Sequence, residues 1–560
     1  MRTITNMMIP MRDGVRLATD LYLPDKEGAY PLILMRTPYD KRDFGNDPLY
    51  ADYPRYVAQG YIVAVQDCRG TVLSEGTINQ NGANEHEDGY DTVEYLAAQP
   101  FSDGNVGMFG LSYFGFTQHA AASMRPPHLK ATCPFMCCSL SSFGTGSMQT
   151  VAAFHLSWAY GQLLERKETY FPDPGVREKV VPLLESFRDK LGEYASFLPM
   201  TDNPAANIPG VPMLCDYVEL AERVEDPEFW KSIHSPMDYD GFHTAMLHGT
   251  GWMDAAVNNT IDNYLAARKS KDAWTRENSK LLIGPWTHGG VLPDSLEGVD
   301  FGRENSGHAQ DVTGMMIRWF DRYLKGKETD CFPGRVRYFV MNKNEWRESA
   351  EWPPEDAVRT RLYLADDLTL GKDIPEKGEL PLVYDPADPA PSFHVDKDGR
   401  AAFADWSEIR DRKDMLFFSS GVFDEGCTIA GDVRARLHVV TDVPDTDFAV
   451  RLTDIAPDGY ERQITTGFVR ARHRNGLFTE DFLTPGEAAC IDFAAGYAGY
   501  FVAPGHRIGL QLAGSLFPQY NRNLNTKEAP SVGKEFTVAH DRILTGAEYA
   551  SFLELPVLAR

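Results

Sequence analysis

The sequence predicts a mixed α/β fold with an inserted helical segment and an all-β region at its C-terminal end. Up to residue 140, short apolar runs of strand length alternate with helical patterns, which is typical of a mostly parallel sheet covered by helices. Only helical spacing is found from 141 to 240, and closely spaced strand-like segments follow residue 350, as in a β-sandwich or jelly roll. The expected segments are a first core part at 1–140, a helical cap at 141–240, a second core part at 241–350 and a jelly-roll β-sandwich at 351–560.

The first core part begins with a predicted β-hairpin. Two segments with imperfect alternation of apolar and polar residues flank the turn signal Asp13-Gly14. Strands then alternate with helices, and the helix expected at 88–99 opens with acidic residues, which suit the positive end of a helix dipole. The expected strands are 31–36, 61–67, 105–112 and 129–137, and the expected helices are 88–99 and 112–124.

After residue 140, the spacing of apolar residues along the chain changes twice. Helical spacing dominates the cap, strands return in the second core part, and residues 351–357 have the composition of a linker. Helices are expected at 180–198, 211–224, 226–233, 255–269 and 313–326, with core strands at 244–254 and 280–290. The segments assigned to the β-rich region are 335–341, 360–366, 414–420, 434–440, 447–455, 465–473, 497–503 and 506–514.

Composition and charge exclude several classes of protein. The 43% of hydrophobic and 24% of charged residues are ordinary for a globular protein. No apolar run approaches the about 20 residues that span a bilayer, and the N-terminus lacks the apolar segment of a signal peptide, so a cytoplasmic location is expected. The formal charge of −25 argues against binding to nucleic acid or to an anionic membrane. The eight cysteines form no paired zinc motif and are expected to be reduced and mostly buried.

The sharpest local motif is Gly110-Leu111-Ser112-Tyr113-Phe114-Gly115, at a predicted strand-to-helix turn. A nucleophile elbow needs small residues near its serine because the turn is tight and strained. The common pattern G-x-S-x-G would place the second glycine at position 114, whereas here it is Gly115. Taken alone, the motif also fits an ordinary glycine-rich turn.

An acid and a histidine follow in the order that α/β-hydrolases use. Asp254 and His288 each come after a predicted strand, which gives the order Ser112, Asp254, His288. Ser112 and Asp254 are 142 positions apart, which is a long separation for this fold. The helical segment at 141–240 accounts for it, since a cap is commonly inserted at that point.

Together these motifs resemble those of the cocaine esterase-like hydrolases, the group that also contains Xaa-Pro dipeptidyl-peptidases and α-amino-acid ester hydrolases. In that group the elbow itself reads G-x-S-Y-x-G. The resemblance implies an α/β-hydrolase core, a helical cap and a C-terminal jelly roll. The matching stretches are 36–42, 67–76, 87–115, 251–254, 284–290 and 505–526.

The site residues follow from the motif and the resemblance. Ser112 is expected to be the nucleophile, His288 the general base and Asp254 the group that orients the imidazole. The backbone N–H of Tyr113, the residue after the nucleophile, is one expected oxyanion donor. Pro38 has no N–H to offer as the second donor, and the resemblance implies that the hydroxyl of Tyr39 replaces it. Without the resemblance, Tyr39 would be interpreted as a structural tyrosine.

Other candidate residues are given structural interpretations. His86 lies in an acidic stretch expected to be a solvated helix start, and His243 and His248 lack the spacing of metal ligands. Asp67 and Arg69 are expected to form a buried ion pair. The aromatic residues are interpreted equally well as an acyl pocket or as core: Trp158, Trp252, Trp286 and Phe116. No metal and no cofactor are predicted, and no nucleotide-binding loop is present in the sequence.

The sequence therefore predicts a serine esterase that cleaves small carboxylic esters through an acyl-enzyme. Amide hydrolysis by an acylase, an aryl-amidase or an Xaa-Pro peptidase is the alternative, although the peptidases carry an extra N-terminal domain and this core begins near Met1. A carbohydrate-binding or adhesion protein is a third hypothesis, disfavoured because all three triad positions are filled. The sequence leaves open whether the chain forms a homodimer.

The stretch after the expected triad acid bears on the substrate. By resemblance, α-amino-acid ester hydrolases hold the substrate ammonium with acidic side chains, two of them in a D-x-E-D arrangement that starts at the triad acid. Here residues 254–257 read Asp-Ala-Ala-Val. A buried ammonium would find no partner there, so a preference for neutral acyl groups is expected.

Overall fold

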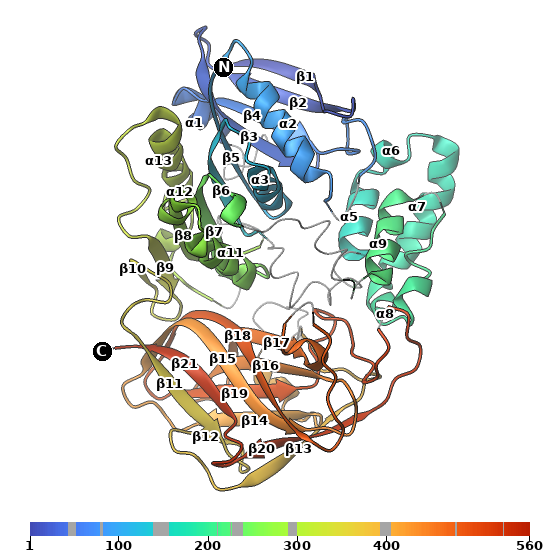
Figure 1. Ribbon diagram of the computed structural model, residues 1–560, viewed down its shortest axis with the longest axis vertical. Coiled ribbons are helices and arrows are strands. Elements are labelled where there is room, and N and C mark those ends of the chain that lie inside the picture. The colour runs from blue at the N-terminus through green and yellow to red at the C-terminus, as the bar shows by residue number, and fades with distance from the viewer. Residues whose placement is uncertain are drawn as a thin grey trace.

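The computed structural model describes residues 1–42, 52–78, 82–137, 156–209, 211–223, 226, 239–288, 299–392, 405–476, 479–529 and 531–559. The N-terminal half is built on a ten-stranded sheet (Figure 1). Its strands lie in the order β1-β2-β4-β3-β5-β6-β7-β8-β9-β10 and are parallel from β4 to β9. The strands are β1 Arg2–Pro10, β2 Arg16–Leu23, β3 Tyr30–Thr37, β4 Ile62–Asp67, β5 Ser102–Leu111, β6 Leu129–Phe135, β7 Ala245–Met253, β8 Ser279–Thr287, β9 Val336–Val340 and β10 Glu345–Ser349.

Two expectations about this sheet have definite outcomes. The predicted N-terminal hairpin is confirmed, since β1 and β2 pair antiparallel across the turn at Gly14. Residues 335–341 are grouped above with the strand-like segments of the β-rich region, although they lie before the expected boundary at residue 350. They form β9, which pairs parallel with β8 and continues the α/β sheet. A short strand has the same sequence pattern in an α/β sheet and in an all-β domain, and only its pairing partner shows to which of the two it belongs.

Helices cover both faces of the sheet because successive residues of a buried strand point to opposite sides. On β3, Leu32 and Leu34 pack with α2 and α3, whereas Ile33 and Met35 belong to a second cluster that includes α13. Helix α13 ends at Gly326, whose φ of 65° suits a residue without a Cβ. The helices of this half are α1 Tyr53–Ala58, α2 Glu85–Ala97, α3 Tyr113–Ser123, α11 Val257–Lys269, α12 Ala273–Glu277 and α13 Val312–Lys325.

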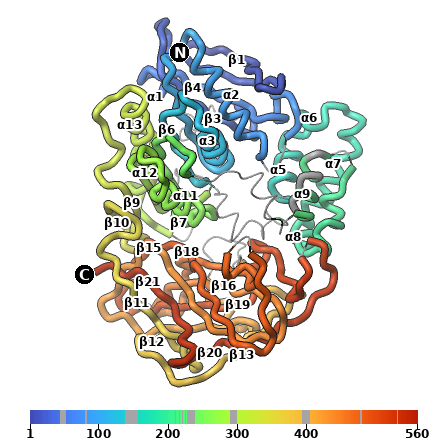
Figure 2. Tube along the Cα trace, in the orientation of Figure 1, coloured from blue at the N-terminus to red at the C-terminus, as the bar shows by residue number. Residues whose placement is uncertain are grey.

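The regular elements that the structure describes between β6 and β7 are all helices, and they lie to one side of the sheet (Figure 2). These helices have a hydrophobic cluster of their own, centred on residues such as Tyr160, Leu184 and Leu214. Helix α7 begins where Asp173 accepts from the N–H of Gly175, with proline at the first helical position. The helices are α5 Leu156–Glu165, α6 Lys167–Tyr170, α7 Pro174–Arg188, α8 Leu191–Ala195 and α9 Pro212–Glu222; most of the predicted helix 226–233 lies outside the described residues.

The C-terminal half is an eleven-stranded, almost entirely antiparallel β structure (Figure 1). Among the described strands of this half, only β12 and β14 pair parallel. It contacts the α/β half through β18, where the Tyr497 hydroxyl donates to Asp262 on α11 at 2.6 Å. The strands are β11 Ala357–Leu364, β12 Thr369–Gly371, β13 Gly378–Tyr384, β14 Met415–Ser420, β15 Cys427–Val440, β16 Asp447–Ile455, β17 Glu461–Arg470, β18 Ala488–Val502, β19 Arg507–Ala513, β20 Ala539–Thr545 and β21 Phe552–Leu558.

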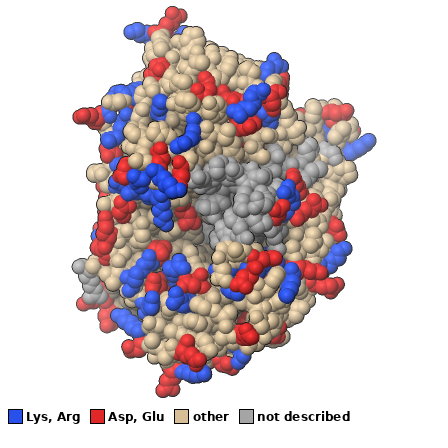
Figure 3. Space-filling model, in the orientation of Figure 1, with Lys and Arg blue, Asp and Glu red and all other residues tan. Residues whose placement is uncertain are grey.

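The surface carries charges of both signs. Acidic and basic side chains are interspersed over the face shown in Figure 3. In the part of the chain that the structure describes, no helix combines the length and the apolar character needed to cross a bilayer.

Candidate active site

Ser112 lies at the sharp turn between β5 and α3. Its backbone has φ 57° and ψ −124°, a conformation that a non-glycine residue rarely adopts. A Cβ on Gly110 would lie 2.5 Å from the Cβ of Phe114, and one on Gly115 would lie 2.8 Å from the Cβ of Cys137. The close approach that demands a second glycine therefore occurs at position 115. The departure from the common G-x-S-x-G pattern thus has a steric reason in this chain.

Three residues far apart in the sequence form one chain of hydrogen bonds. His288 Nε2 lies 2.9 Å from Ser112 Oγ, and His288 Nδ1 lies 2.7 Å from Asp254 Oδ1. They meet because β5, β7 and β8 run parallel, so their carboxyl ends reach the same edge of the sheet. This is the arrangement of a nucleophile, a base and an orienting acid.

The carboxylate of Asp254 is buried and fully engaged. Its Oδ2 accepts from the hydroxyl of Thr250 at 3.0 Å, and its Oδ1 accepts from the backbone N–H of Ala256 at 2.9 Å as well as facing His288. Only 3% of the residue is exposed. The sequence does not identify Thr250 as the partner of Asp254, although its position four residues before the acid on the same strand is a signal for it.

The pKa of His288 is raised above its ordinary value. Burial alone lowers the pKa, but the hydrogen bond to Asp254 and the negative charge of that carboxylate raise it by more. The imidazolium that forms when His288 accepts a proton is thus stabilised by Asp254.

Tyr39 lies two residues beyond β3 and faces the elbow. Its ring packs edge-on against Phe114, with centroids 5.3 Å apart. Two cap residues hold it: Trp158 Nε1 donates to the Tyr39 hydroxyl oxygen at 3.0 Å, and Arg166 Nε donates to the Tyr39 carbonyl at 2.6 Å. The tyrosine is therefore fixed at both its hydroxyl and its backbone.

Tyr113 is the first residue of α3, so its N–H has no partner within the helix. Its hydroxyl donates to Glu85 at 3.1 Å, and its ring is stacked on Trp158 with centroids 6.1 Å apart and an interplanar angle of 9°. Burial and the nearby Glu85 charge raise the pKa of Tyr113, which keeps the phenol protonated.

The expectation of a solvated acidic helix start at residues 84–88 is wrong. Glu85, His86 and Asp88 are all buried, because the start of α2 faces the guanidinium of Arg36 inside the protein. Arg36 Nη1 lies 2.6 Å from Glu85 Oε2, and Arg69 Nη2 lies 2.5 Å from Asp88 Oδ1. The Glu85 carboxylate of the first pair also accepts from the Tyr113 hydroxyl.

The expected ion pair between Asp67 and Arg69 is also wrong. Asp67 accepts from the backbone N–H groups of Lys41 and Leu73, while Arg69 turns to Asp88 and Asp13. Burial raises the pKa of Asp67 to about 6. A separation of two residues does not decide which carboxylate an arginine reaches.

The four candidate aromatic residues separate into two pairs. Trp158 and Phe116 contact Tyr113, whereas Trp286 is a fully buried core residue and Trp252 donates to the Phe339 carbonyl beside the β-rich half.

The remaining candidates show no ligand arrangement among the described residues. His248 is buried beside His119, and burial lowers its pKa well below the ordinary value. His243 pairs with Asp272 at 2.9 Å. Within the described ranges, no group of three His, Cys, Asp or Glu residues is placed to hold a metal ion.

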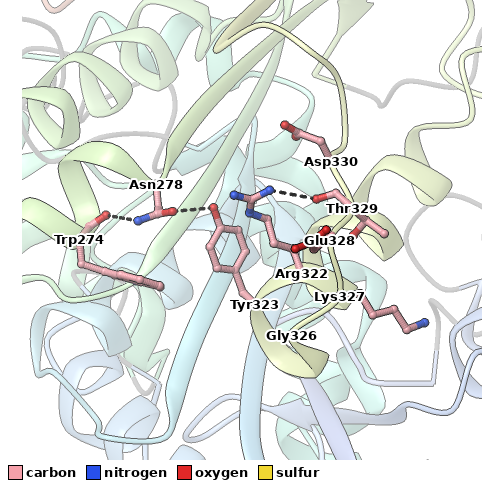
Figure 4. Close-up of a pocket in the computed structure, with 9 residues that line it drawn as sticks. All are labelled: Trp274, Asn278, Arg322, Tyr323, Gly326, Lys327, Glu328, Thr329 and Asp330. Atoms are coloured by element: carbon pink, nitrogen blue, oxygen red, sulfur yellow. Dashed lines mark hydrogen bonds between the residues drawn. The ribbon is translucent and has the colours of Figure 1, made fainter.

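A surface hollow of about 630 Å³ lies away from these residues (Figure 4). Arg322 and Tyr323 at the end of α13 line one side, and Trp274 and Asn278 line the other. Asn278 accepts from the Tyr323 hydroxyl at 2.9 Å. The hollow adjoins the amino end of β8, whereas His288 follows its carboxyl end.

The chain matches two protein families. Residues 13–290 match the family described as X-Pro dipeptidyl-peptidase (S15 family), and residues 333–554 match the X-Pro dipeptidyl-peptidase C-terminal non-catalytic domain. The chain is 35% identical to the cocaine esterase of Rhodococcus sp. (strain MB1 Bresler), over 99% of this chain and 98% of the other.

Several solved structures are similar over almost the whole chain, among them the following two. An aminopeptidase from the marine sediment archaeon Thaumarchaeota archaeon has a TM-score of 0.81 at 23% identity, covering 100% of this chain and 96% of the other. An α-amino acid ester hydrolase has a TM-score of 0.74 at 25% identity, covering 99% and 96%.

Proposed function

Because the chain belongs to the X-Pro dipeptidyl-peptidase (S15) family and is a serine hydrolase, we propose that it cleaves carboxylic esters through an acyl-enzyme on Ser112. The observation that carries the proposal is the chain of hydrogen bonds from Ser112 through His288 to Asp254 at a strained turn. Similarity to a cocaine esterase along nearly the full length supports ester chemistry.

In the first half-reaction, Ser112 Oγ attacks the ester carbonyl while His288 Nε2 takes the hydroxyl proton. The negative oxygen of the tetrahedral intermediate accepts from the N–H of Tyr113 and from the hydroxyl of Tyr39. When the intermediate collapses, the C–O bond to the alcohol breaks and His288 returns the proton to the leaving oxygen. Asp254 holds the imidazole in the required tautomer throughout.

In the second half-reaction, water replaces the alcohol. His288 removes a proton from the water, whose oxygen attacks the acyl carbon of the Ser112 ester. The same two donors receive the second oxyanion. Collapse releases the carboxylic acid and restores the Ser112 hydroxyl with the proton held by His288.

A fluorophosphonate probe tests this proposal directly. Such probes phosphonylate an activated serine, so the protein is expected to carry one label on Ser112, located by peptide mass spectrometry. The variant Ser112→Ala is the control and is expected to remain unlabelled. A wild-type protein that stays unlabelled, or a label on another residue, would overturn the proposal.

Amide hydrolysis is a second candidate because the matching family is described by a peptidase activity. Esters and amides pass through the same acyl-enzyme and differ in the leaving group. A panel of p-nitrophenyl esters and p-nitroanilides with matched acyl groups separates the two. We expect kcat/KM to be higher for each ester than for the matched anilide, by more than the difference in their intrinsic reactivity explains. A higher kcat/KM for the anilides would assign the chain to amide chemistry.

The replacement Tyr39→Phe is expected to lower kcat by roughly 10²–10³-fold. It removes one oxyanion donor and almost no volume. KM should change much less, because the negative charge develops only in the transition state. Steady-state kinetics with a p-nitrophenyl ester measure both quantities, and a normal kcat would return Tyr39 to a purely structural role.

The acyl preference is expected to be for neutral groups. Ala256 is buried beside Asp254, and neither it nor Val257 offers the charge that a substrate ammonium needs after losing its water. We therefore expect a phenylacetate ester to have a higher kcat/KM than the phenylglycine ester of the same alcohol near pH 6, where the amine is charged. A clear preference for the phenylglycine ester would contradict this expectation.

A further inference from the structure

Helix α5 of the cap reaches both of the tyrosines to which the proposed mechanism assigns oxyanion donors. Trp158 contacts the Tyr39 hydroxyl through its indole N–H and the Tyr113 ring through its face. Arg166, directly after the same helix, donates to the Tyr39 carbonyl. Residues 158–166 of the cap thus contact the hydroxyl and the carbonyl of Tyr39 and the ring of Tyr113.

The direction of the hydrogen bond between Trp158 and Tyr39 is determined by chemistry. An indole N–H can only donate, so the Tyr39 oxygen must be the acceptor across the 3.0 Å contact. A phenol has a single O–H proton and accepts through its lone pairs. The bond from Trp158 therefore occupies a lone pair of the Tyr39 oxygen and does not use its proton.

The stacking partner adds a second constraint. Tyr113 is held at its hydroxyl by Glu85, which accepts a hydrogen bond from it and is itself paired with the buried Arg36. The ring of Trp158 lies nearly parallel to the ring of Tyr113, with an interplanar angle of 9° and centroids 6.1 Å apart. The indole plane is therefore set by a residue that is anchored in the hydrolase core, and within this plane the N–H reaches the Tyr39 oxygen.

We infer that Trp158 is a positioning residue that orients the Tyr39 hydroxyl for the oxyanion. With the Trp158 N–H on its lone pair, the hydroxyl rotor is restricted, and its proton points toward the developing charge. Accepting a hydrogen bond also makes a hydroxyl a better donor, since hydrogen bonds in a chain polarise one another. This inference rests on the proposed function, and specifically on Tyr39 acting as an oxyanion donor.

A double-mutant cycle between Trp158 and Tyr39 tests the inference. Trp158→Phe keeps an aromatic ring against Tyr113 and removes the N–H, and it is expected to lower kcat by about tenfold with less than a twofold change in KM. In a Tyr39→Phe background there is no hydroxyl to orient, so adding Trp158→Phe should change kcat by less than about twofold. If Trp158 only lined the substrate pocket, Trp158→Phe would lower kcat by the same factor in the wild type and in the Tyr39→Phe variant.

Two further variants isolate the N–H. Trp158→benzothienylalanine preserves the shape and the stacking area of the side chain while replacing the N–H by sulfur, and it should reproduce the Trp158→Phe loss in kcat. Trp346→Phe is the matched control, since its indole N–H donates to Asn305 at 2.9 Å in a different part of the protein. It should leave kcat within about twofold of the wild type.

The outcomes separate this inference from the proposed function. If Tyr39→Phe has a normal kcat, the oxyanion role of Tyr39 fails and this inference fails with it. If Tyr39→Phe is impaired but Trp158→benzothienylalanine is not, or if Trp158→Phe has equal effects in both backgrounds, only the positioning role is overturned. A kcat effect that disappears in the Tyr39→Phe background supports it.

Discussion

Replacing Ser112 by alanine is expected to lower kcat by on the order of 10⁶-fold, because without the nucleophile the acyl-enzyme cannot form. The fold should remain intact, since the substitution removes one oxygen at a position where a Cβ is already accommodated. Hydrolysis of a p-nitrophenyl ester measures the loss, and thermal unfolding followed by circular dichroism checks the fold.

The Ser112 variant also has a matched control on the same helix. Ser123→Ala, at the C-terminal end of α3, likewise removes a serine hydroxyl, one that donates to the Ala120 carbonyl and lies 2.9 Å from His86. This variant should retain kcat within about tenfold. Activity of Ser112→Ala within tenfold of the wild type would place the nucleophile elsewhere.

Replacing Asp254 by asparagine is expected to lower kcat by about 10⁴-fold, because the amide favours the wrong imidazole tautomer. The pH dependence should change as well. His288 must be neutral to accept the Ser112 proton, so kcat/KM falls as the pH drops through the pKa of His288 in the free enzyme. Asp254 raises this pKa, whereas burial lowers it.

Without the Asp254 charge, burial is no longer opposed and the pKa of His288 should therefore fall. The acid limb of the pH profile should move to lower pH in Asp254→Asn, relative to the wild type. The measurement is kcat/KM from pH 4 to 9 for both proteins with a substrate that does not titrate. An acid limb that stays in place, or moves to higher pH, would show that Asp254 does not raise the pKa of His288.

Local patterns in the sequence predicted much of the architecture. The family likeness and the similar structures confirm the predicted α/β-hydrolase core and C-terminal all-β domain. Residues 335–341 were grouped with the β-rich segments although they continue the α/β sheet, because a short strand-like segment does not reveal whether a parallel or an antiparallel neighbour pairs with it.

The residues of the candidate site could be predicted from the sequence for a related reason. Ser112, Asp254 and His288 each follow a strand of a parallel sheet, and such strands end at one edge. Knowledge of the strand order along the chain is then enough to bring the three residues together. The hydrogen-bond partner of Asp254 on β7, Thr250, was missed because a threonine in a strand is ordinary.

The sequence by itself determined which residue types stand at the ends of the strands, because strand and elbow patterns are local properties of the chain. Only the tertiary structure decided the partners of Glu85, Arg69 and Trp158. Each of these contacts joins elements separated by many residues, and a buried charge or an indole N–H pairs with whichever complementary group the packing brings within about 3 Å. That proximity is a property of the packed elements and not of the neighbouring sequence.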